Sequence, residues 1–212
     1  MNTLRLIDKP ECPFCWRIRI AAALQGRLVE HLNREDPEVQ AEWERLSPSR
    51  TVPVLIDGGV VVTDSGPMLE YLAETGPALL PENVCARVQA RSLVVYADNP
   101  LGRVIREVVF EKRGKAEADW NQERLQQATA DFVAVLPVLE QCLEGREYLV
   151  GDAASLAECA LLPRFALAIA YGLPIPVGFP RLQAWFDRLI ARPELLSTAP
   201  PELRDRLRGV NA

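Results

Sequence analysis

The chain has 212 residues, with 24 basic and 29 acidic side chains, a net charge of −5 and 49% hydrophobic residues. This length allows one large domain or two small ones, and it is ample for a buried core. The basic residues form no run, so a nucleic acid is not expected as a partner. The five cysteines are too sparse for a secreted disulfide scaffold and the first residues lack a signal-peptide pattern, so we expect a cytoplasmic protein.

The first 75 residues alternate short apolar runs with helical patterns. Strands are predicted at residues 4–7, 28–32, 52–56 and 60–62. Helices are predicted to begin at Cys12, at Asp36 and at Thr63-Asp64-Ser65, where the polar residues cap the helix. Asp57-Gly58-Gly59 predicts a hairpin between the last two strands. The predicted order is strand, helix, strand, helix, strand, strand, helix, which is an α/β domain of residues 1–75.

Helical patterns alone follow this domain. Residues 76–83 contain the glycine and proline breakers of an interdomain linker, and residues 84–212 predict an all-helical domain. Apolar residues recur at helical spacing in three core-facing stripes, which start at Leu101, Phe132 and Leu182. Asn99-Pro100 is expected to break the first long helix, because proline lacks the backbone donor. A bend there would shape a cleft near residues 96–105.

The most apolar segment covers residues 153–173. It contains Glu158, Arg164 and a proline, so it predicts a buried helix and not a membrane span. Ser155 and Glu158 have the spacing of a capping box at the start of this helix, a structural motif with no catalytic role. The expected core also includes three cysteines in helical segments, Cys85, Cys142 and Cys159.

Cys12-Pro13-Phe14-Cys15 is the motif with the clearest chemistry. Cys12 falls at a helix N-terminus, where unpaired N–H groups and the helix dipole favour a thiolate, and Pro13 suits the first helical position. Arg17, one turn further on, would add positive potential. Cys15 is expected on the same side of the first turn, where it can resolve a disulfide formed at Cys12.

Two other interpretations of the motif remain. A zinc site would need further ligands, but the chain has no second pair of cysteines at this spacing and His31 is its only histidine, so no metal is expected. The two cysteines would alternatively be buried and inert, because a free cysteine packs as a small apolar residue. The strand, turn and helix around the motif favour thiol chemistry.

Two further segments suggest a ligand for the thiol. Pro53 lies inside a predicted strand, and a cis bond there would turn the Val52 backbone outward to pair with a peptide; the alternative is a trans proline on an edge strand. Asp64 and Ser65 offer a carboxylate for an ammonium group and N–H and hydroxyl donors for a carboxylate, although the pair is also an ordinary helix cap. A thiol site, an extended-backbone site and a zwitterion site together describe the tripeptide glutathione.

These motifs carry a family resemblance. The first 75 residues resemble a thioredoxin-fold domain, with Cys12-Pro13-Phe14-Cys15 similar to the glutaredoxin active site. The helical remainder resembles a cytosolic glutathione transferase, and the cysteine-containing members, such as the omega-like group and the two-domain glutaredoxins, are the most similar. The resemblance implies a cis Pro53, Ser65 bound to the γ-glutamyl carboxylate, and Cys12 facing the glutathione sulfur. Transferases usually have Glu or Gln where this chain has Asp64.

The expected activity is glutathione-dependent thiol transfer or disulfide reduction, with Cys12 as nucleophile and Cys15 as an optional resolver. Glutathione is the expected co-substrate, bound by Pro13, Phe14, Val52, Pro53, Asp64 and Ser65. The second substrate would be a small disulfide or an electrophile. Candidates for the glycyl carboxylate contact are Arg34 and Arg50. The family also implies a homodimer.

Two rival functions are kept. One is a transferase that conjugates glutathione to electrophiles, although such enzymes usually carry a Ser or Tyr hydroxyl where this chain has Cys12. The other is a non-enzymatic adaptor that retains the fold for protein contacts. An intact thiol site argues against the adaptor.

Overall fold

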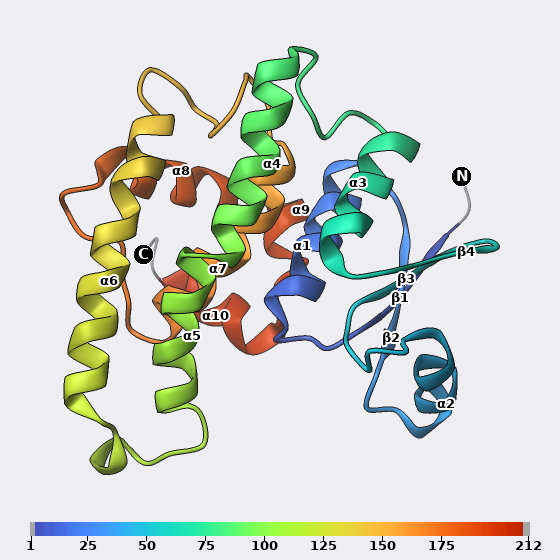
Figure 1. The fold of residues 1–212 in the computed structure, drawn as a ribbon, viewed down its shortest axis with the longest axis horizontal. Helices are drawn as coiled ribbons and strands as arrows, with labels where there is room; N and C mark the ends of the chain where they lie inside the picture. Colours follow the sequence, from blue (N-terminus) through green and yellow to red (C-terminus); the bar gives the residue numbers. More distant parts are fainter. Residues whose placement is uncertain (1–2, 210–212) are drawn as a thin grey trace.

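The computed structural model of the protein describes residues 3–209, and Figure 1 shows an α/β half beside a helical half. The strands of the α/β half are β1 (Leu4–Asp8), β2 (Val29–Asn33), β3 (Val54–Asp57) and β4 (Val60–Thr63). Its helices are α1 (Pro13–Leu24), α2 (Pro37–Leu46) and α3 (Ser65–Thr75). This is the predicted order of elements.

The strands form one mixed sheet in the order β2-β1-β3-β4. β1 pairs with β2 in parallel, because α1 carries the chain back across the sheet, and β1–β3 and β3–β4 are antiparallel. Gly58 and Gly59 form the hairpin turn, and Gly58 has a φ of 58° that favours glycine. The predicted strand at 52–56 begins two residues too early, because Pro53 has no N–H for the ladder.

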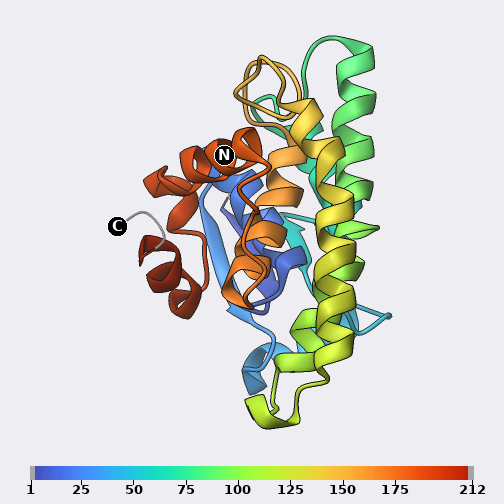
Figure 2. The same ribbon diagram turned by 90° about the vertical axis from the view of Figure 1, so that its left-hand side faces the viewer.

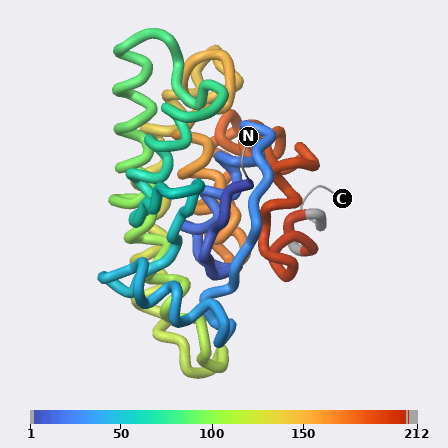
Figure 3. The backbone as a smooth tube through the Cα atoms, turned by 90° about the vertical axis from the view of Figure 1, so that its right-hand side faces the viewer, coloured from blue at the N-terminus to red at the C-terminus, as the bar shows by residue number. Residues whose placement is uncertain are grey.

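The two faces of the sheet have different partners. Leu4, Leu6 and Leu55 pack in the core that contains α1, α3 and the helical half. Ile7 and Val54 point to the other face, where they form a small cluster with residues of α2. Figure 3 views the molecule from the α2 side. One face of the sheet therefore supports the segments next to Cys12.

The helical half contains six helices of nine or more residues within the described chain. These are α4 (Val84–Asp98), α5 (Leu101–Lys112), α6 (Gln122–Cys142), α7 (Leu156–Ala170), α8 (Pro180–Ile190) and α10 (Pro201–Gly209), with the short α9 (Pro193–Leu196) between the last two. The expected break at Asn99-Pro100 is confirmed, because α4 ends before it and α5 begins after it. Together with the sheet, these helices confirm the predicted thioredoxin-like α/β domain followed by a helical part.

α7 is the central helix of this half, between α6 and α10 in Figure 2. Nearly all of its residues are buried, as the apolar composition predicted. The capping box at its start is confirmed: Glu158 accepts the Ser155 N–H at 2.8 Å, and the Ser155 hydroxyl oxygen accepts backbone N–H groups of the first turn, including that of Ala157 at 3.2 Å. Within residues 3–209, no helix is long and apolar enough to cross a membrane.

One hydrophobic core joins the two halves, from Leu4 in β1 to Leu207 in α10. Across the boundary, Trp16 Nε1 donates to Thr198 Oγ1 at 2.8 Å. The segment predicted as a linker, residues 76–83, contains neither helix nor strand, and its Leu79 is buried with its carbonyl accepting the Leu156 N–H. The outer limits predicted for the domains, residues 1 and 212, lie outside the described chain.

The prediction that three helical cysteines belong to the core is wrong for Cys85 and only partly right for Cys142. Cys159 is fully buried in α7, and Cys142 is half-buried. Cys85 is exposed. It lies five positions before the buried Ala90, which places it about 140° around the helix, away from the core-facing stripe.

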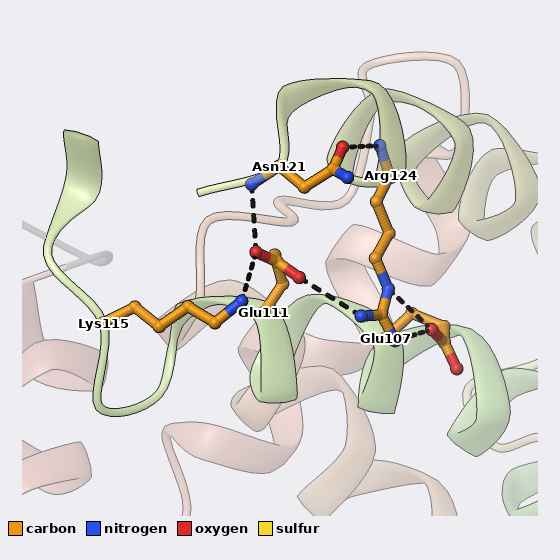
Figure 4. Close-up of polar contacts among 5 residues, drawn as sticks. All are labelled: Glu107, Glu111, Lys115, Asn121 and Arg124. Atoms are coloured by element: carbon orange, nitrogen blue, oxygen red, sulfur yellow. Dashed lines mark hydrogen bonds and ion pairs between the residues drawn. The ribbon is translucent and has the colours of Figure 1, made fainter. Parts of the chain in front are cut away.

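A buried carboxylate anchors the connection between α5 and α6 (Figure 4). Glu111 is 2% exposed and accepts from Lys115 Nζ at 2.7 Å, the Asn121 N–H at 2.9 Å and Arg124 Nη1 at 3.2 Å. Arg124 also donates from Nε to Glu107 at 3.0 Å. These contacts join both ends of the segment that carries the chain from α5 into α6.

We expect Glu111→Gln to loosen this segment, because the amide removes the charge that Lys115 and Arg124 surround. The hydrogen bond from Lys115 lowers the pKa of Glu111, followed by that from the Asn121 N–H. A lowered carboxyl pKa gives a stabilising contribution that is present at neutral pH and is lost as pH falls through that pKa. Hydrogen exchange over residues 112–121 should therefore rise severalfold in the variant at pH 7, but not in Glu123→Gln. Equal exchange in the unmodified protein, Glu111→Gln and Glu123→Gln would contradict the role of Glu111.

Candidate functional site

The site is built around the N-terminus of α1. Cys12 is the N-cap residue, its N–H donates to the Lys9 carbonyl at 3.1 Å, and its carbonyl accepts the Trp16 N–H at 2.9 Å. Pro13 occupies the first helical turn, as predicted. The Cys12 side chain is half-buried and Cys15 is fully buried. The structure therefore presents the first cysteine to the surface and keeps the second inside.

The two thiols of the motif ionise differently. The hydrogen bond from the Cys15 thiol lowers the pKa of Cys12 to about 6, against the effect of burial, and the N–H groups of Cys15 and Phe14 and the Arg164 charge act in the same direction. Burial raises the pKa of Cys15, and the neighbouring Cys12 raises it further. Cys12 is therefore the more acidic thiol of the pair, and Cys15 is the less acidic one.

Two arginines and one aspartate lie next to the motif. Arg17 donates to both oxygens of Asp98, with Nη1 at 3.1 Å from Oδ2, and Arg164 Nη2 donates to Asp98 Oδ1 at 2.9 Å. Both guanidinium groups lie over the Phe14 ring, at 5.0 Å for Arg17 and 4.5 Å for Arg164. Arg17 was expected only to add positive potential, but it joins α1 to the helical half.

Arg17 also connects the motif to the predicted zwitterion site. Its Nη1 lies 3.4 Å from Ser65 Oγ, at the first residue of α3. Ser65 is 8% exposed, whereas Asp64 is exposed. The expected cap is wrong for the Asp64 side chain: its φ of 65° accompanies an N-cap position without a side-chain capping bond, so the carboxylate does not occupy the helix N–H groups.

The predicted peptide-pairing segment has the expected backbone. The Val52–Pro53 bond is cis, and the segment directly precedes β3. Val52 is half-buried and packs against the cluster on the α2 side of the sheet.

The two arginines suggested for a glycyl carboxylate have different surroundings. Arg34 lies over the Trp43 ring at 5.0 Å, with Nη2 3.7 Å from Glu35 Oε1. Arg50 is exposed and has a φ of 53°.

Within residues 3–209, no group of three or more metal-ligating side chains is placed to hold a metal ion.

A cavity of about 130 Å³ lies beside the motif, and the two neighbours of Cys12, Glu11 and Pro13, contribute to its wall. The other wall residues come from α1, from the C-terminal end of α5, from α7 and its C-terminal end, and from the C-terminal part of the chain: Trp16, Arg113, Pro163, Leu167, Ala170, Tyr171, Pro200, Glu202 and Leu203. Arg113 crosses the rim, with Nη2 3.3 Å from Glu11 and Nε donating to the Tyr171 hydroxyl at 3.1 Å. The cavity is mostly apolar with a charged rim.

The prediction that residues 96–105 shape the cleft is wrong for this cavity. Leu101, Val104 and Ile105 are buried in the core, and the Tyr96 hydroxyl donates to the Val135 carbonyl. Asp98 of that stretch instead binds Arg17 and Arg164 beside the motif. Sequence reasoning missed Arg113, Arg164 and the α10 residues, although a lone arginine in the apolar segment at 153–173 was a usable signal.

Comparison with known proteins agrees with this architecture. The model of the glutathione S-transferase N-terminal domain matches residues 11–75, and the model of the C-terminal domain matches residues 108–193. A probable maleylacetoacetate isomerase from Vibrio cholerae is 33% identical over 201 residues, which cover 90% of this chain and 92% of that protein. The chain belongs to the glutathione transferase superfamily.

Other transferases extend the comparison. A probable glutathione S-transferase from Nicotiana tabacum is 27% identical over 216 residues. The alignment covers 98% of the present chain and 92% of the tobacco protein. The crystal structure of a glutathione transferase from Burkholderia graminis, with two glutathione molecules bound per subunit, superposes with a TM-score of 0.78 at 26% identity. The superposition covers 92% of the present chain and 87% of the Burkholderia graminis chain.

Proposed function

We propose that this protein is a glutathione-dependent thiol transferase that reduces mixed disulfides through Cys12. The observation that carries the proposal is the placement of the motif: the half-buried Cys12 lies at the N-terminus of α1 beside the buried Cys15, and the hydrogen bond from Cys15 lowers the pKa of Cys12 to about 6. The thiolate is the nucleophile in disulfide exchange, so Cys12 is ready to react at neutral pH. Five free cysteines suit the reducing cytoplasm expected for such an enzyme.

The proposed cycle has two exchanges. The Cys12 thiolate attacks the glutathionyl sulfur of a mixed disulfide, a new S–S bond joins Cys12 to glutathione, and the substrate sulfur leaves as a thiolate and takes a proton. The thiolate of a second glutathione then attacks the sulfur of the bound glutathionyl group, which releases oxidised glutathione and restores Cys12. Across the two exchanges, one glutathione thiol is consumed, and the mixed disulfide is converted to the substrate thiol and oxidised glutathione. Cys15 is not required for either step.

The proposed glutathione site combines the segments around Cys12. The cis Val52–Pro53 segment would pair with the extended peptide, Ser65 with its N–H and hydroxyl would hold the γ-glutamyl carboxylate, and Asp64 would hold the ammonium group. Pro13 and Phe14 would contact the cysteinyl part. The glutathione in the Burkholderia graminis crystal structure supports this co-substrate.

Asp64→Ala is expected to raise the dissociation constant of glutathione about tenfold or more, because a charge-assisted hydrogen bond of about 1.5–3 kcal/mol is lost. Titration calorimetry measures this change. Glu44→Ala removes another exposed carboxylate, from α2, and should leave the affinity unchanged. Unchanged binding in Asp64→Ala would place the ammonium group elsewhere.

The activity itself is tested by a parallel assay. We expect reduction of hydroxyethyl disulfide with glutathione to exceed conjugation of chlorodinitrobenzene, because a cysteine at position 12 forms a disulfide with glutathione more readily than it activates the glutathione thiol. The apolar cavity beside Pro13 is the proposed place for the second substrate. Dominant conjugation would favour the conjugating transferase, and the absence of both activities together with glutathione binding would favour the adaptor.

A second candidate function is glutathione-dependent isomerisation of a conjugated double bond. The Vibrio cholerae relative named as a probable maleylacetoacetate isomerase motivates this candidate. A thiolate adds to the double bond, the resulting single bond rotates, and elimination returns the thiolate, so no oxidant or reductant is consumed. Conversion of maleylacetoacetate followed by ultraviolet absorbance, with retained activity in Cys12→Ser, would favour isomerisation by bound glutathione over thiol transfer.

We also propose a homodimer that uses the outer face of α4. Val84, Val88 and Val95 are 70%, 56% and 65% exposed and lie on one face of the helix, which is an unusual concentration of exposed apolar side chains. Sedimentation at micromolar concentration should give twice the monomer mass, and Val88→Glu should shift it to the monomer. A monomer in the unmodified protein would remove the proposal.

A further inference from the structure

We infer that Arg164, a residue of the helical half, is a positioning residue that keeps the Cys12 sulfur ionised by supplying the surplus positive charge of a buried cluster. This inference rests on the proposed function, because it gives Arg164 a role through the nucleophile. It assigns control of the thiol to a part of the chain that is distant from the motif in sequence.

The cluster has an uneven charge. Asp98 is the one carboxylate bound by both Arg17 and Arg164, so two positive groups share a single negative group. The side chains of Arg17 and Arg164 are 0% and 7% exposed, and that of Asp98 is 38% exposed. Because the arginines are shielded from water, their surplus charge acts over a longer distance than an exposed charge does.

The cluster lies directly against the active-site turn. Phe14, the third residue of the motif, is contacted by both guanidinium groups, and the Arg164 group is the nearer of the two at 4.5 Å from the ring centre. The ring is 37% exposed and covers the arginines at this turn. A thiolate at Cys12 is therefore close to the surplus charge, and the Arg164 charge favours the ionised form of Cys12.

The backbone makes room for Arg164. A Cβ atom at Gly102 would lie 2.9 Å from Arg164 Cζ and 2.6 Å from the Ala97 carbonyl oxygen, so a larger residue at the start of α5 would displace the guanidinium or the turn. Burial disfavours the charged form of Arg164. It lowers the pKa of Arg164, and the neighbouring Arg17 charge lowers that pKa further. The contact with Asp98 offsets these costs and keeps the arginine in place.

The other charged groups that face the motif are paired. On the sheet side, Arg19 Nη1 lies 3.2 Å from the buried Asp8, which His31 Nδ1 also approaches at 3.4 Å. On the cavity side, Glu11 lies 3.3 Å from Arg113.

Two more titratable groups lie near the motif. Glu202 of α10 lines the same cavity wall as Glu11. Cys15 is the thiol neighbour inside α1, and it donates to Cys12. The cluster of Arg17, Asp98 and Arg164 therefore provides a buried positive surplus, whereas the cavity side adds carboxylates.

The test uses two neutralising variants with opposite expected effects. Alkylation of Cys12 by iodoacetamide is measured against pH by peptide mass spectrometry, without glutathione. Arg164→Gln removes the surplus charge and should move the midpoint upward by about one pH unit, whereas Asp98→Asn increases the surplus and should move it downward. Arg164→Lys keeps the charge and should restore most of the original midpoint.

Loss of packing alone would not move the two midpoints in opposite directions. An unchanged midpoint in Arg164→Gln, or shifts of the same sign in both neutralising variants, would overturn the inference. If Arg164→Gln does not fold, an unchanged or raised midpoint in Asp98→Asn overturns it. Disulfide reduction by the unmodified protein is measured in parallel: opposite shifts without reductase activity reject the proposed function alone, and activity without the shifts rejects Arg164 alone.

Discussion

Cys12→Ser is expected to lower the rate of glutathione-dependent disulfide reduction by more than about a hundredfold, because the hydroxyl is not ionised at neutral pH and cannot replace the thiolate. In the unmodified protein, Cys12 should alkylate fastest of the five cysteines, with a half-maximal rate near pH 6. The hydroxyethyl disulfide assay and peptide mass spectrometry measure these two properties. If activity survives Cys12→Ser, the two cysteines of the motif are packed structural thiols and Cys12 is not the nucleophile.

Cys15→Ser is the matched control, because it also replaces a thiol sulfur with a hydroxyl oxygen, one helical turn away from Cys12. External glutathione can resolve the disulfide at Cys12, so much of the activity should remain. Part of the Cys15→Ser protein should carry one added glutathione in the mass spectrum, because the internal resolver is absent. If Cys15→Ser abolishes activity and Cys12→Ser does not, the two roles are reversed.

Glu158→Ala is expected to cause the largest loss of stability. The carboxylate is fully buried and accepts the Leu149 N–H at 2.8 Å, both Ser155 donors at 2.8 Å and Trp185 Nε1 at 3.4 Å. An unpaired buried donor costs about 1–3 kcal/mol, so the loss of a partner for these four donors is expected to cost about 4 kcal/mol or more. This is a large part of the free energy of unfolding of a typical protein, about 5–15 kcal/mol.

The stability prediction is measured by thermal unfolding. A loss of this size lowers Tm by about 10 °C in a chain of this length. Glu158→Gln keeps one acceptor oxygen and should lose less than Glu158→Ala. Glu144, whose side chain is 70% exposed, provides the matched control, and Glu144→Ala should change the free energy of unfolding by less than about 0.5 kcal/mol. Equal stability of Glu158→Ala and Glu144→Ala would contradict the role of the capping carboxylate.

Local patterns predicted most of the fold. Turn residues such as Gly58 and helix-starting residues such as Pro13 act within a few positions, so the order of elements and the start of α1 followed from the sequence. Pro53 had a similar local signature, because a proline inside a strand pattern is unusual. The errors were also local: the strand started after Pro53, and Asp64 did not cap α3 with its side chain.

The site beyond the motif could not be predicted in the same way. Asp98 binds Arg17 from 81 residues away in the sequence, and it binds Arg164 from 66 residues away. Such pairs depend on how the helical half packs on α1, which no local pattern specifies. The sequence pattern also assigned Cys85 to the core, because the residues around it are apolar. Such a pattern does not specify the direction in which one side chain points, and Cys85 is exposed.

The common core has a practical consequence for finding substrates. Since apolar packing continues from Leu4 to Leu207, we expect the protein to melt in one cooperative transition. A compound that binds the native cavity stabilises the whole chain by mass action, by about 2.7 kcal/mol at a concentration one hundred times its Kd. A thermal shift screen of small disulfides and single-ring electrophiles would therefore register binding at either half, even for compounds on which the enzyme does not act.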